Sequence, residues 1–402
     1  MISSVSSLAD LVRDENSQTV VPLDIFENGH WLKTFQCPMN LVCALVVVKG
    51  NRSEDLVDLI AGRVDASDLR RAQKILDSIS SSSFIDVGRI LRDSKYACEI
   101  QDKLNSDTVD EFMKIFKGQF AVLSLNSSGC RIIQKILDIG PPENRQKIMF
   151  PGLSARILDM CIDVNGNHVV QKYIDVSPSR DCVFLVETLQ AEPGSVIRLA
   201  SHSYGCRVIQ RLMTRCDMRH VEYIFDTLCA NSETIEKLSQ DVFGNYVMQQ
   251  AIEFGRDIDR ERIGICFASH PDIVRLACSK FASNVVEKSI RYHNKRREGT
   301  AVVVTKLMLN AILASIDPIT AEPGLLTLMK DRYGNYVVRA MIELTSVEFA
   351  RETSLVRSVI SDNSQFLKKF TFSWHLVERL EKLNSSTDIG NHEDHDENLH
   401  TL

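Results

Sequence analysis

The sequence predicts an all-α protein, built as a solenoid in which similar helical units stack side by side. Two observations carry this prediction: a five-residue pattern recurs six times at near-constant spacing, and each copy starts an amphipathic helix. The intervals between copies are 37, 39, 39, 38 and 52 residues. Repeats of roughly 34–47 residues with helical patterning are typical of α-solenoids, because one unit cannot bury its apolar face alone.

The six copies begin in the same way. Five of them follow directly on a glycine, which marks the turn that leads into the helix, and Ala282 takes this place in the fifth copy. In chain order the copies are Cys130–Gln134, Asn167–Gln171, Cys206–Gln210, Asn245–Gln249, Ser283–Glu287 and Asn335–Arg339.

The apolar residues keep one register in all copies. When the first residue of each copy is numbered offset 0, offsets 2, 3, 6 and 7 are apolar throughout, except at Ser289. These offsets form one face of an α-helix, so each helix is predicted to bury that face in a shared core.

A second pattern lies on the other side of these helices. Offsets 0 and 4 are one turn apart and are predicted to point away from the apolar face, with offset 1 beside them. The pairs at offsets 0 and 4 are Cys130/Gln134, Asn167/Gln171, Cys206/Gln210, Asn245/Gln249, Ser283/Glu287 and Asn335/Arg339. Offset 1 holds side chains with a planar group, namely Arg131, His168, Arg207, Tyr246, Asn284 and Tyr336.

These residue types suit the edges and faces of unpaired bases. Asn with Gln offers donors and acceptors for uracil, whereas a small Cys with Gln leaves room for adenine. Ser with Glu places an acceptor opposite the N–H donors of guanine, and the planar group at offset 1 can stack on a base. The pattern therefore predicts single-stranded RNA binding, with one base per helical repeat.

The copies closely resemble the repeats of the Pumilio (PUF) family over residues 120–382. KFASNVVEKSI and KDRYGNYVVRAMI resemble its last two base-reading repeats, and FTFSWHLVERLEKL (residues 370–383) resembles its C-terminal cap. The resemblance implies a right-handed, crescent-shaped solenoid of about eight three-helix repeats over residues 56–383. Repeats within 56–119 are expected to be degenerate, and the cap, with Trp374 and Glu378 at offsets 0 and 4, is not expected to read a base.

The resemblance also implies a function. RNA runs antiparallel to the protein in this family, so the copies read from last to first predict 5′-UGUAUA-3′. Family members bind UGU-containing elements in mRNA 3′ untranslated regions and recruit deadenylase or translational repressors. The implied protein is a cytoplasmic monomer that uses no cofactor, metal or catalytic residue.

Two departures from the family pattern stand out. Arg339 replaces the usual Gln, and because guanidinium cannot accept the N3–H of uracil, we expect weaker selection of U with C tolerated, unless Arg339 holds a phosphate. Residues 291–324 lengthen the last interval and include the basic run His293–Arg297. This segment is interpreted either as a loop that docks a corepressor or deadenylase, or as a tolerated insertion.

The ends of the chain lack the motif. Residues 1–55 are predicted to be an N-terminal extension, and either Ser94–Cys98 or Ala97–Gln101 sets the register of a degenerate repeat. Residues 384–402 are predicted to be an acidic, disordered tail. The whole chain has a formal net charge of -6, yet this acidity lies mostly at its two ends and leaves residues 101–380 nearly neutral.

Other classes of protein find little support. The longest apolar run, Leu41–Val48, is far shorter than the roughly 18–20 residues of a membrane span, and the N-terminus has no basic and apolar secretory signal. The 11 cysteines include no CxxC pair, which argues against zinc. No GxSxG or HExxH motif indicates an enzyme. The alternatives are an armadillo- or HEAT-like protein-binding scaffold and a ribosome-biogenesis relative of the PUF family.

Overall fold

The computed structural model describes residues 85–149, 156–295, 300–317 and 319–393. Their regular secondary structure is helical, and within these ranges the only β-type pairing is an isolated antiparallel bridge between Ile316 and Pro323. The chain divides into two compact units. The first comprises Met1–Gln119 with Asn126–Ile132, and the second comprises Phe120–Leu125 with Ile133–Leu402.

The described part of the first unit contains α5 (Val87–Arg92), α6 (Ser94–Lys103) and α7 (Val109–Ile115). Helix α6 buries Ala97 and Ile100 and exposes Cys98 and Glu99. In the register that starts at Ser94, Ala97 and Ile100 fall at the apolar offsets 3 and 6, as their burial requires. The register that starts at Ala97 would place the exposed Glu99 at the apolar offset 2.

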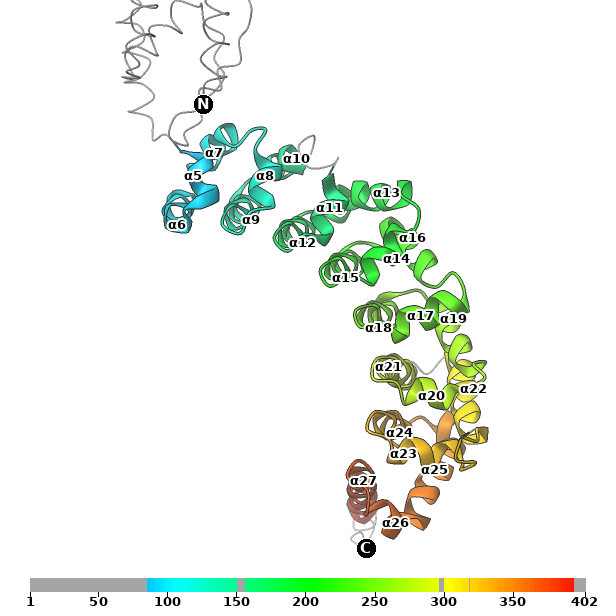
Figure 1. The fold of residues 1–402 in the computed structure, drawn as a ribbon. Coiled ribbons are helices and arrows are strands. Elements are labelled where there is room, and N and C mark those ends of the chain that lie inside the picture. The colour runs from blue at the N-terminus through cyan, green and yellow to red at the C-terminus, as the bar shows by residue number, and fades with distance from the viewer. Residues whose placement is uncertain (1–84, 150–155, 296–299, 318, 394–402) are drawn as a thin grey trace, which may run out of the picture. The chain divides into compact units, whose positions relative to one another are not determined.

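The second unit repeats a group of three helices: a short lead helix, a middle helix and an outer helix (Figure 1). The lead helices are α8 (Phe120–Ser124), α11 (Ile157–Ile162), α14 (Ser195–Ala200), α17 (Ser232–Gln240), α20 (Ile273–Ala277) and α23 (Gly324–Lys330). The middle helices are α9 (Gly129–Ile139, whose first residues belong to the first unit), α12 (Gly166–Val176), α15 (Gly205–Arg215), α18 (Gly244–Phe254), α21 (Ala282–Lys295) and α24 (Gly334–Ile342). The outer helices are α10 (Pro142–Met149), α13 (Val183–Ala191), α16 (Met218–Leu228), α19 (Asp257–Ala268), α22 (Thr300–Ala314) and α25 (Ala350–Asp362), and α26 (Ser364–Leu367) with α27 (Trp374–Glu393) close the chain.

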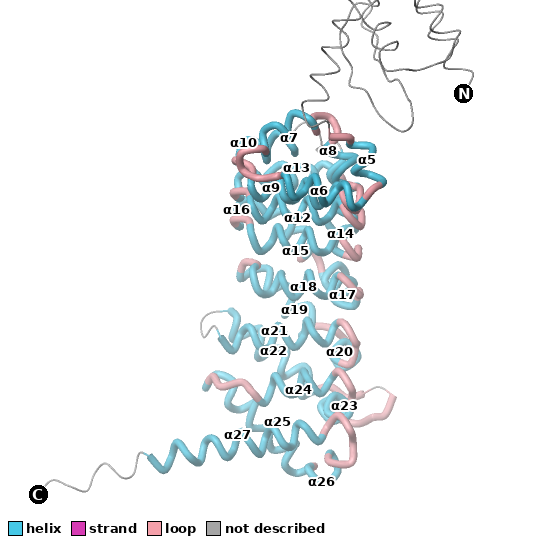
Figure 2. Tube along the Cα trace, turned by 90° about the vertical axis from the view of Figure 1, so that its left-hand side faces the viewer, coloured by secondary structure: helices cyan, strands magenta, loops and turns pink. Residues whose placement is uncertain are grey.

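The middle helices of the second unit form one row. Each of α12, α15, α18, α21 and α24 packs against the next, and α24 packs against α27 (Figure 2). We call α12, α15, α18, α21 and α24 the readout row. The residues at offsets 2, 3, 6 and 7 in all six copies are at most 3% exposed, including Ser289. The predicted all-α solenoid and its apolar register are therefore confirmed.

Four of the glycines before the copies are required by close packing rather than by a turn conformation. Gly166, Gly205, Gly244 and Gly334 are each the first residue of a middle helix and lie against the preceding lead helix. A Cβ on Gly244 would lie 2.7 Å from the carbonyl oxygen of Leu238, and one on Gly334 would lie 2.9 Å from that of Leu328. The helix starts so near the backbone behind it that a side chain has almost no room there.

Two boundaries predicted from the sequence are corrected. Most of the segment 291–324 is not a loop, because α22 lies within it and buries Met308, Leu309 and Ile312 as the outer helix of its repeat. The acidic tail was expected from residue 384, but α27 continues to Glu393. The residues after 383 are polar and show no apolar face, so the sequence did not predict that the helix continues through them. Residues 394–402 and the predicted extension 1–55 lie outside the described residues.

Candidate nucleic-acid interface

The residues at offset 0 are buried rather than exposed, which corrects the sequence-based expectation. Those of all six copies, from Cys130 to Asn335, are between 1% and 7% exposed. The cause is the tight helix start, which places offset 0 beneath the turn that precedes it. The offset 4 side chains are partly exposed, apart from the exposed Arg339, and the offset 1 side chains are exposed. In each helix of the readout row the three offsets thus form a graded surface, and we call these surfaces together the readout face.

In the two Asn/Gln repeats, the asparagine is anchored to the backbone and holds the glutamine. Asn167 donates from Nδ2 to the carbonyl oxygens of Asp163 (2.7 Å) and Val164 (3.0 Å). Its Oδ1 then accepts a hydrogen bond of 2.8 Å from Nε2 of Gln171. Asn245 and Gln249 repeat this arrangement. Both amide donors of the asparagine are thereby used within the protein, so Gln supplies the mobile donor and acceptor atoms.

In the two Cys/Gln repeats, the thiol of a smaller side chain replaces the asparagine amide at offset 0. Sγ of Cys130 lies 3.4 Å from the carbonyl oxygen of Ser127, and Sγ of Cys206 lies 3.5 Å from that of Ser203. Burial raises the pKa of the Cys206 thiol, so it stays protonated at neutral pH. Gln210 donates to the carbonyl oxygen of Cys206 at 3.1 Å. A neutral, compact group at offset 0 therefore leaves space for a larger base.

The repeat of α21 is the one readout repeat with an acid at offset 4. Ser283 is small and buried, and one oxygen of Glu287, Oε1, accepts a 2.7 Å hydrogen bond from Nε of Arg291. A carboxylate has two oxygens and accepts several hydrogen bonds, so Glu287 keeps acceptor capacity for N–H donors of a base.

The offset 1 residues differ in how free they are to stack. Tyr246 and Tyr336 are 50% and 51% exposed as whole residues, as a stacking surface requires. Asn284, in contrast, donates from Nδ2 to the carbonyl oxygens of Lys280 (3.1 Å) and Phe281 (3.3 Å). Its amide plane is therefore held against its own turn.

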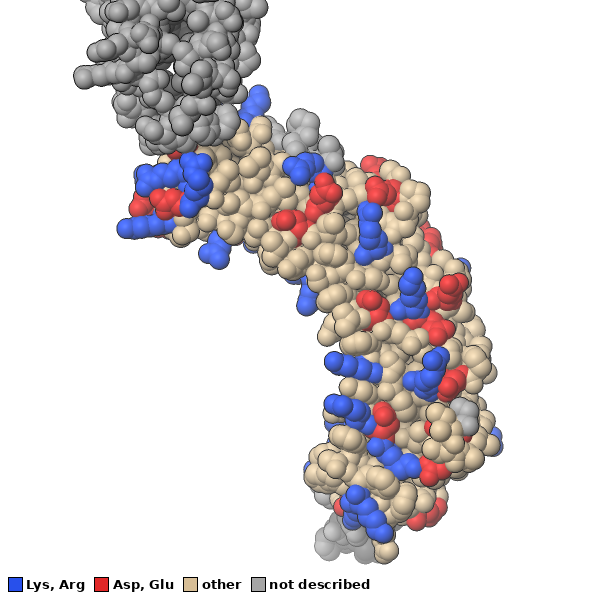
Figure 3. Space-filling model, viewed as in Figure 1, with Lys and Arg blue, Asp and Glu red and all other residues tan. Residues whose placement is uncertain are grey.

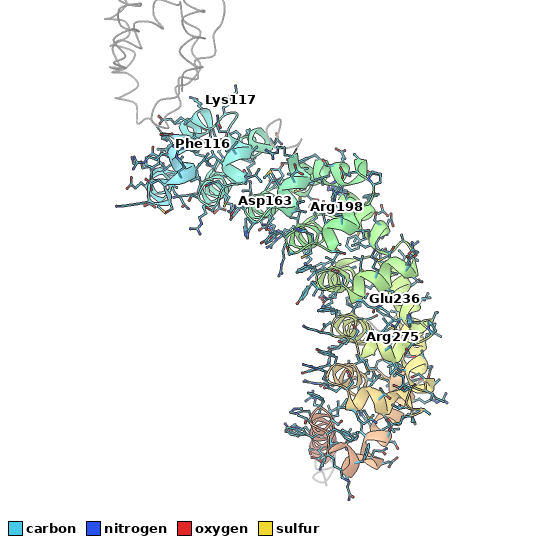
Figure 4. The ribbon with its side chains drawn as sticks, viewed as in Figure 1. Phe116, Lys117, Asp163, Arg198, Glu236 and Arg275 are labelled. Atoms are coloured by element: carbon cyan, nitrogen blue, oxygen red, sulfur yellow. The ribbon has the colours of Figure 1, made fainter. Side chains whose placement is uncertain are left out.

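A further position, four residues before offset 0, was missed in the sequence. Its side chain accepts hydrogen bonds from two backbone N–H groups at the start of each middle helix. Asp163, labelled in Figure 4, accepts from Asn165 and Gly166, and Asp241 accepts from Phe243 and Gly244. The residues at this position are Asn126, Asp163, His202, Asp241, Ser279 and Asp331. All six of these residues can accept a hydrogen bond, so this position could have been recognised from the sequence.

We expect Asp241→Ala to destabilise the protein by about 1 kcal/mol, as loss of a helix cap does, because the N–H groups of Phe243 and Gly244 lose their acceptor. Urea unfolding measures this change. Asp241→Asn keeps the Oδ1 acceptor and serves as the matched control, which should recover most of the lost stability. Equal stability of the Ala variant and the unchanged protein would show that the cap contributes nothing.

Ion pairs join successive middle helices of the second unit beside the readout face, and they were not predicted from the sequence. An acid at offset 8 pairs with a cation at offset 5 of the next helix. Asp138 pairs with Lys172 at 3.4 Å, Asp175 with Arg211 at 3.4 Å, and Glu253 with Lys288. Figure 3 shows Lys and Arg side chains projecting along this edge of the second unit. These exposed pairs contribute little stability each, but they place positive charge beside the readout row.

The described residues hold no group of three or more His, Cys, Asp or Glu side chains placed to bind a metal. Over the same residues, no helix has the length and apolar character needed to cross a membrane.

The fold and the site define a class: a helical repeat protein with the chemistry of base recognition spaced along one row of helices. The model of the Pumilio-family RNA binding repeat (PUF) matches residues 119–149, 156–189, 195–229, 235–263, 272–292 and 325–349. Each match covers most of the lead helix and the middle helix of one group, and the last two matches end before the outer helices α22 and α25. The chain belongs to the Pumilio (PUF) family of RNA-binding repeat proteins.

Similar proteins agree with this assignment. Pumilio domain-containing protein C6G9.14 of Schizosaccharomyces pombe is 28% identical over 59% of this chain and 32% of its own length. Suppressor protein MPT5 of Saccharomyces cerevisiae is 29% identical over 55% of this chain and 28% of its own. The chain thus spans about a third of these relatives. The solved structure of the Puf3 RNA binding domain bound to a Cox17 RNA 3′ UTR recognition sequence is 26% identical, with a TM-score of 0.58 over 84% of this chain and 94% of that one.

Proposed function

We propose that this protein binds single-stranded RNA sequence-specifically and recognises UGU-containing elements, about 5′-UGUAUA-3′, with one base per repeat. The observation that carries the proposal is the readout face: Asn/Gln, Cys/Gln and Ser/Glu pairs recur in register on adjacent helices, with a planar group beside most of them. The family membership favours this reading over an armadillo- or HEAT-like scaffold, and the well-formed pairs favour it over a ribosome-biogenesis role.

The proposed role of this binding is repression of mRNAs through elements in their 3′ untranslated regions, by blocking translation or promoting deadenylation. The Puf3 domain, which is similar to this chain, is bound to such a 3′ UTR sequence in its solved structure. We propose that the protein acts as a cytoplasmic monomer and recruits a corepressor or deadenylase, with no catalysis of its own. Because α22 contributes buried residues to the core, a docking role for 291–324 rests on exposed residues that follow this helix, such as Ile316 and Ile319.

Fluorescence anisotropy with labelled oligonucleotides tests the binding. We expect UGUAUA to bind about a hundredfold more tightly than ACAAUA, since each correctly read base contributes roughly 1–3 kcal/mol. Equal binding of the two RNAs would contradict the proposal. Varying only the first nucleotide tests the repeat of Arg339, where we expect U and C to bind within tenfold of each other because guanidinium only donates.

A further inference from the structure

One acidic residue outside the readout offsets is linked to two readout repeats at once. Glu343 follows α24 directly and its side chain is only 14% exposed. Its Oε2 accepts a 2.6 Å hydrogen bond from Nη1 of Arg291 on α21, and its Oε1 accepts from Nε of Arg379 at 2.6 Å and Nε of Arg339 at 3.2 Å. Three guanidinium groups from three helices therefore meet on one carboxylate.

This carboxylate has no role in ending the helix. A negative charge at a helix C-terminus is unfavourable because it faces the negative end of the macrodipole. Burial also disfavours the charged form of Glu343, but the hydrogen bonds from Arg291, Arg379 and Arg339 outweigh it and hold the pKa of Glu343 below its usual value. The three arginines thus stabilise the charge of Glu343, and Glu343 in turn holds their guanidinium groups in place.

The arginines connect Glu343 to the readout face. Arg291 is shared, because its Nε donates to Oε1 of Glu287 while its Nη1 donates to Glu343. With Nη1 on Glu343, the guanidinium meets Glu287 through Nε and Oε1 alone, and not through the two-oxygen fork that Arg and carboxylate otherwise favour. The second oxygen of Glu287 stays available for a base. Arg339, at offset 4 of α24, is held by the same carboxylate through Nε.

We propose that Glu343 is a positioning residue for base selection: it holds Arg291 back from Glu287 and fixes Arg339, so that the repeats of α21 and α24 select their bases jointly. This inference rests on the proposed RNA-reading function. The network contains two carboxylates and three guanidinium groups, so neutralising Glu343 makes it more cationic. RNA of any sequence is then attracted at least as strongly, while selection at two bases falls.

The test compares E343Q with the unchanged protein in anisotropy titrations at one salt concentration. The RNAs are UGUAUA, UAUAUA, which changes the base assigned to Glu287, and UGUUUA, which changes the base assigned to Cys206 and Gln210. We expect the G-over-A ratio at the second base to fall by about tenfold, because a charge-assisted hydrogen bond is weakened. Affinity for UAUAUA should not fall, and selection at the fourth base should not change. A merely structural role would lower all affinities together.

E253Q is the matched control, because Glu253 also lies at offset 8 but pairs with Lys288, a cation at offset 5 rather than at a readout offset. It should leave all ratios unchanged. Should E343Q unfold, E343D keeps the charge, and the same selective fall is expected since the shorter side chain no longer reaches Arg291. An unchanged G-over-A ratio in a folded Glu343 variant, or an equal fall in E253Q, would overturn this inference alone. A wild-type protein that does not prefer UGUAUA to ACAAUA would overturn the proposed function with it.

Discussion

Replacing Glu287 with alanine should abolish selection of guanine at the second base and weaken binding of UGUAUA by about tenfold to a hundredfold. The carboxylate is the acceptor assigned to the N–H donors of guanine. Without it, those donors are left unpaired in a site from which the stacked base excludes water, which costs more than the loss of an exposed contact. The fold should be little affected, because Arg291 keeps its hydrogen bond to Glu343.

Glu287→Gln sharpens this prediction, because it creates a Ser/Gln pair. A small residue with Gln is the combination assigned to adenine in the repeats of Cys130 and Cys206. We therefore expect the Gln variant to prefer UAUAUA to UGUAUA, as measured by competition between the two labelled RNAs. If both variants kept the wild-type preference for guanine, α21 would not be the repeat that reads this base.

The sequence predicted the fold well because its two periodicities are strong and mutually consistent. The spacing of the copies implies stacked units, and the apolar offsets name the buried residues; those 24 positions in the six copies are all buried, down to Ser289. The outer helix α22 was missed since its repeat has a longer interval, and the interval was interpreted as an insertion. Its own apolar residues, such as Met308 and Ile312, are the evidence that was overlooked.

The site was only partly predictable. Helical geometry correctly placed the offset 1 side chains in solvent and left the offset 4 side chains at least partly exposed. It failed at offset 0, because burial there depends on the preceding turn rather than on the helix. Asn167 uses its amide donors on that turn, which a helical projection cannot show.

Contacts between repeats were the least predictable feature. The link from Arg291 to Glu343 spans 52 positions, and an ordinary helical spacing relates Glu343 only to Arg339. The ion pairs between offsets 8 and 5 are regular enough to be found in the sequence once the stacking of the helices is known. Without the stacking, Asp175 and Arg211 are two unrelated surface charges.

The largest effect on stability is expected from Gly244→Ala, at about 1–3 kcal/mol. A Cβ there would lie 2.7 Å from the carbonyl oxygen of Leu238 and 3.1 Å from both the Cα of Leu238 and the Cβ of Asp241. Two of these atoms are backbone and cannot move aside as the end of a flexible side chain would. Either α18 shifts away from α17, or the cap formed by Asp241 is lost.

Urea unfolding of Gly244→Ala measures this cost, and Ala282→Gly is its matched control. Ala282 occupies the same position at the start of α21, where the chain already accommodates a buried Cβ. Its replacement therefore costs the lower helix propensity of glycine, about 1 kcal/mol or less, and the burial of one methyl group, but it creates no close approach. Alanine has the higher propensity, so Gly244→Ala would stabilise the protein if space were not limiting. A stabilised Gly244→Ala variant would therefore show that helix propensity, and not the close approach of α18 to α17, governs this position.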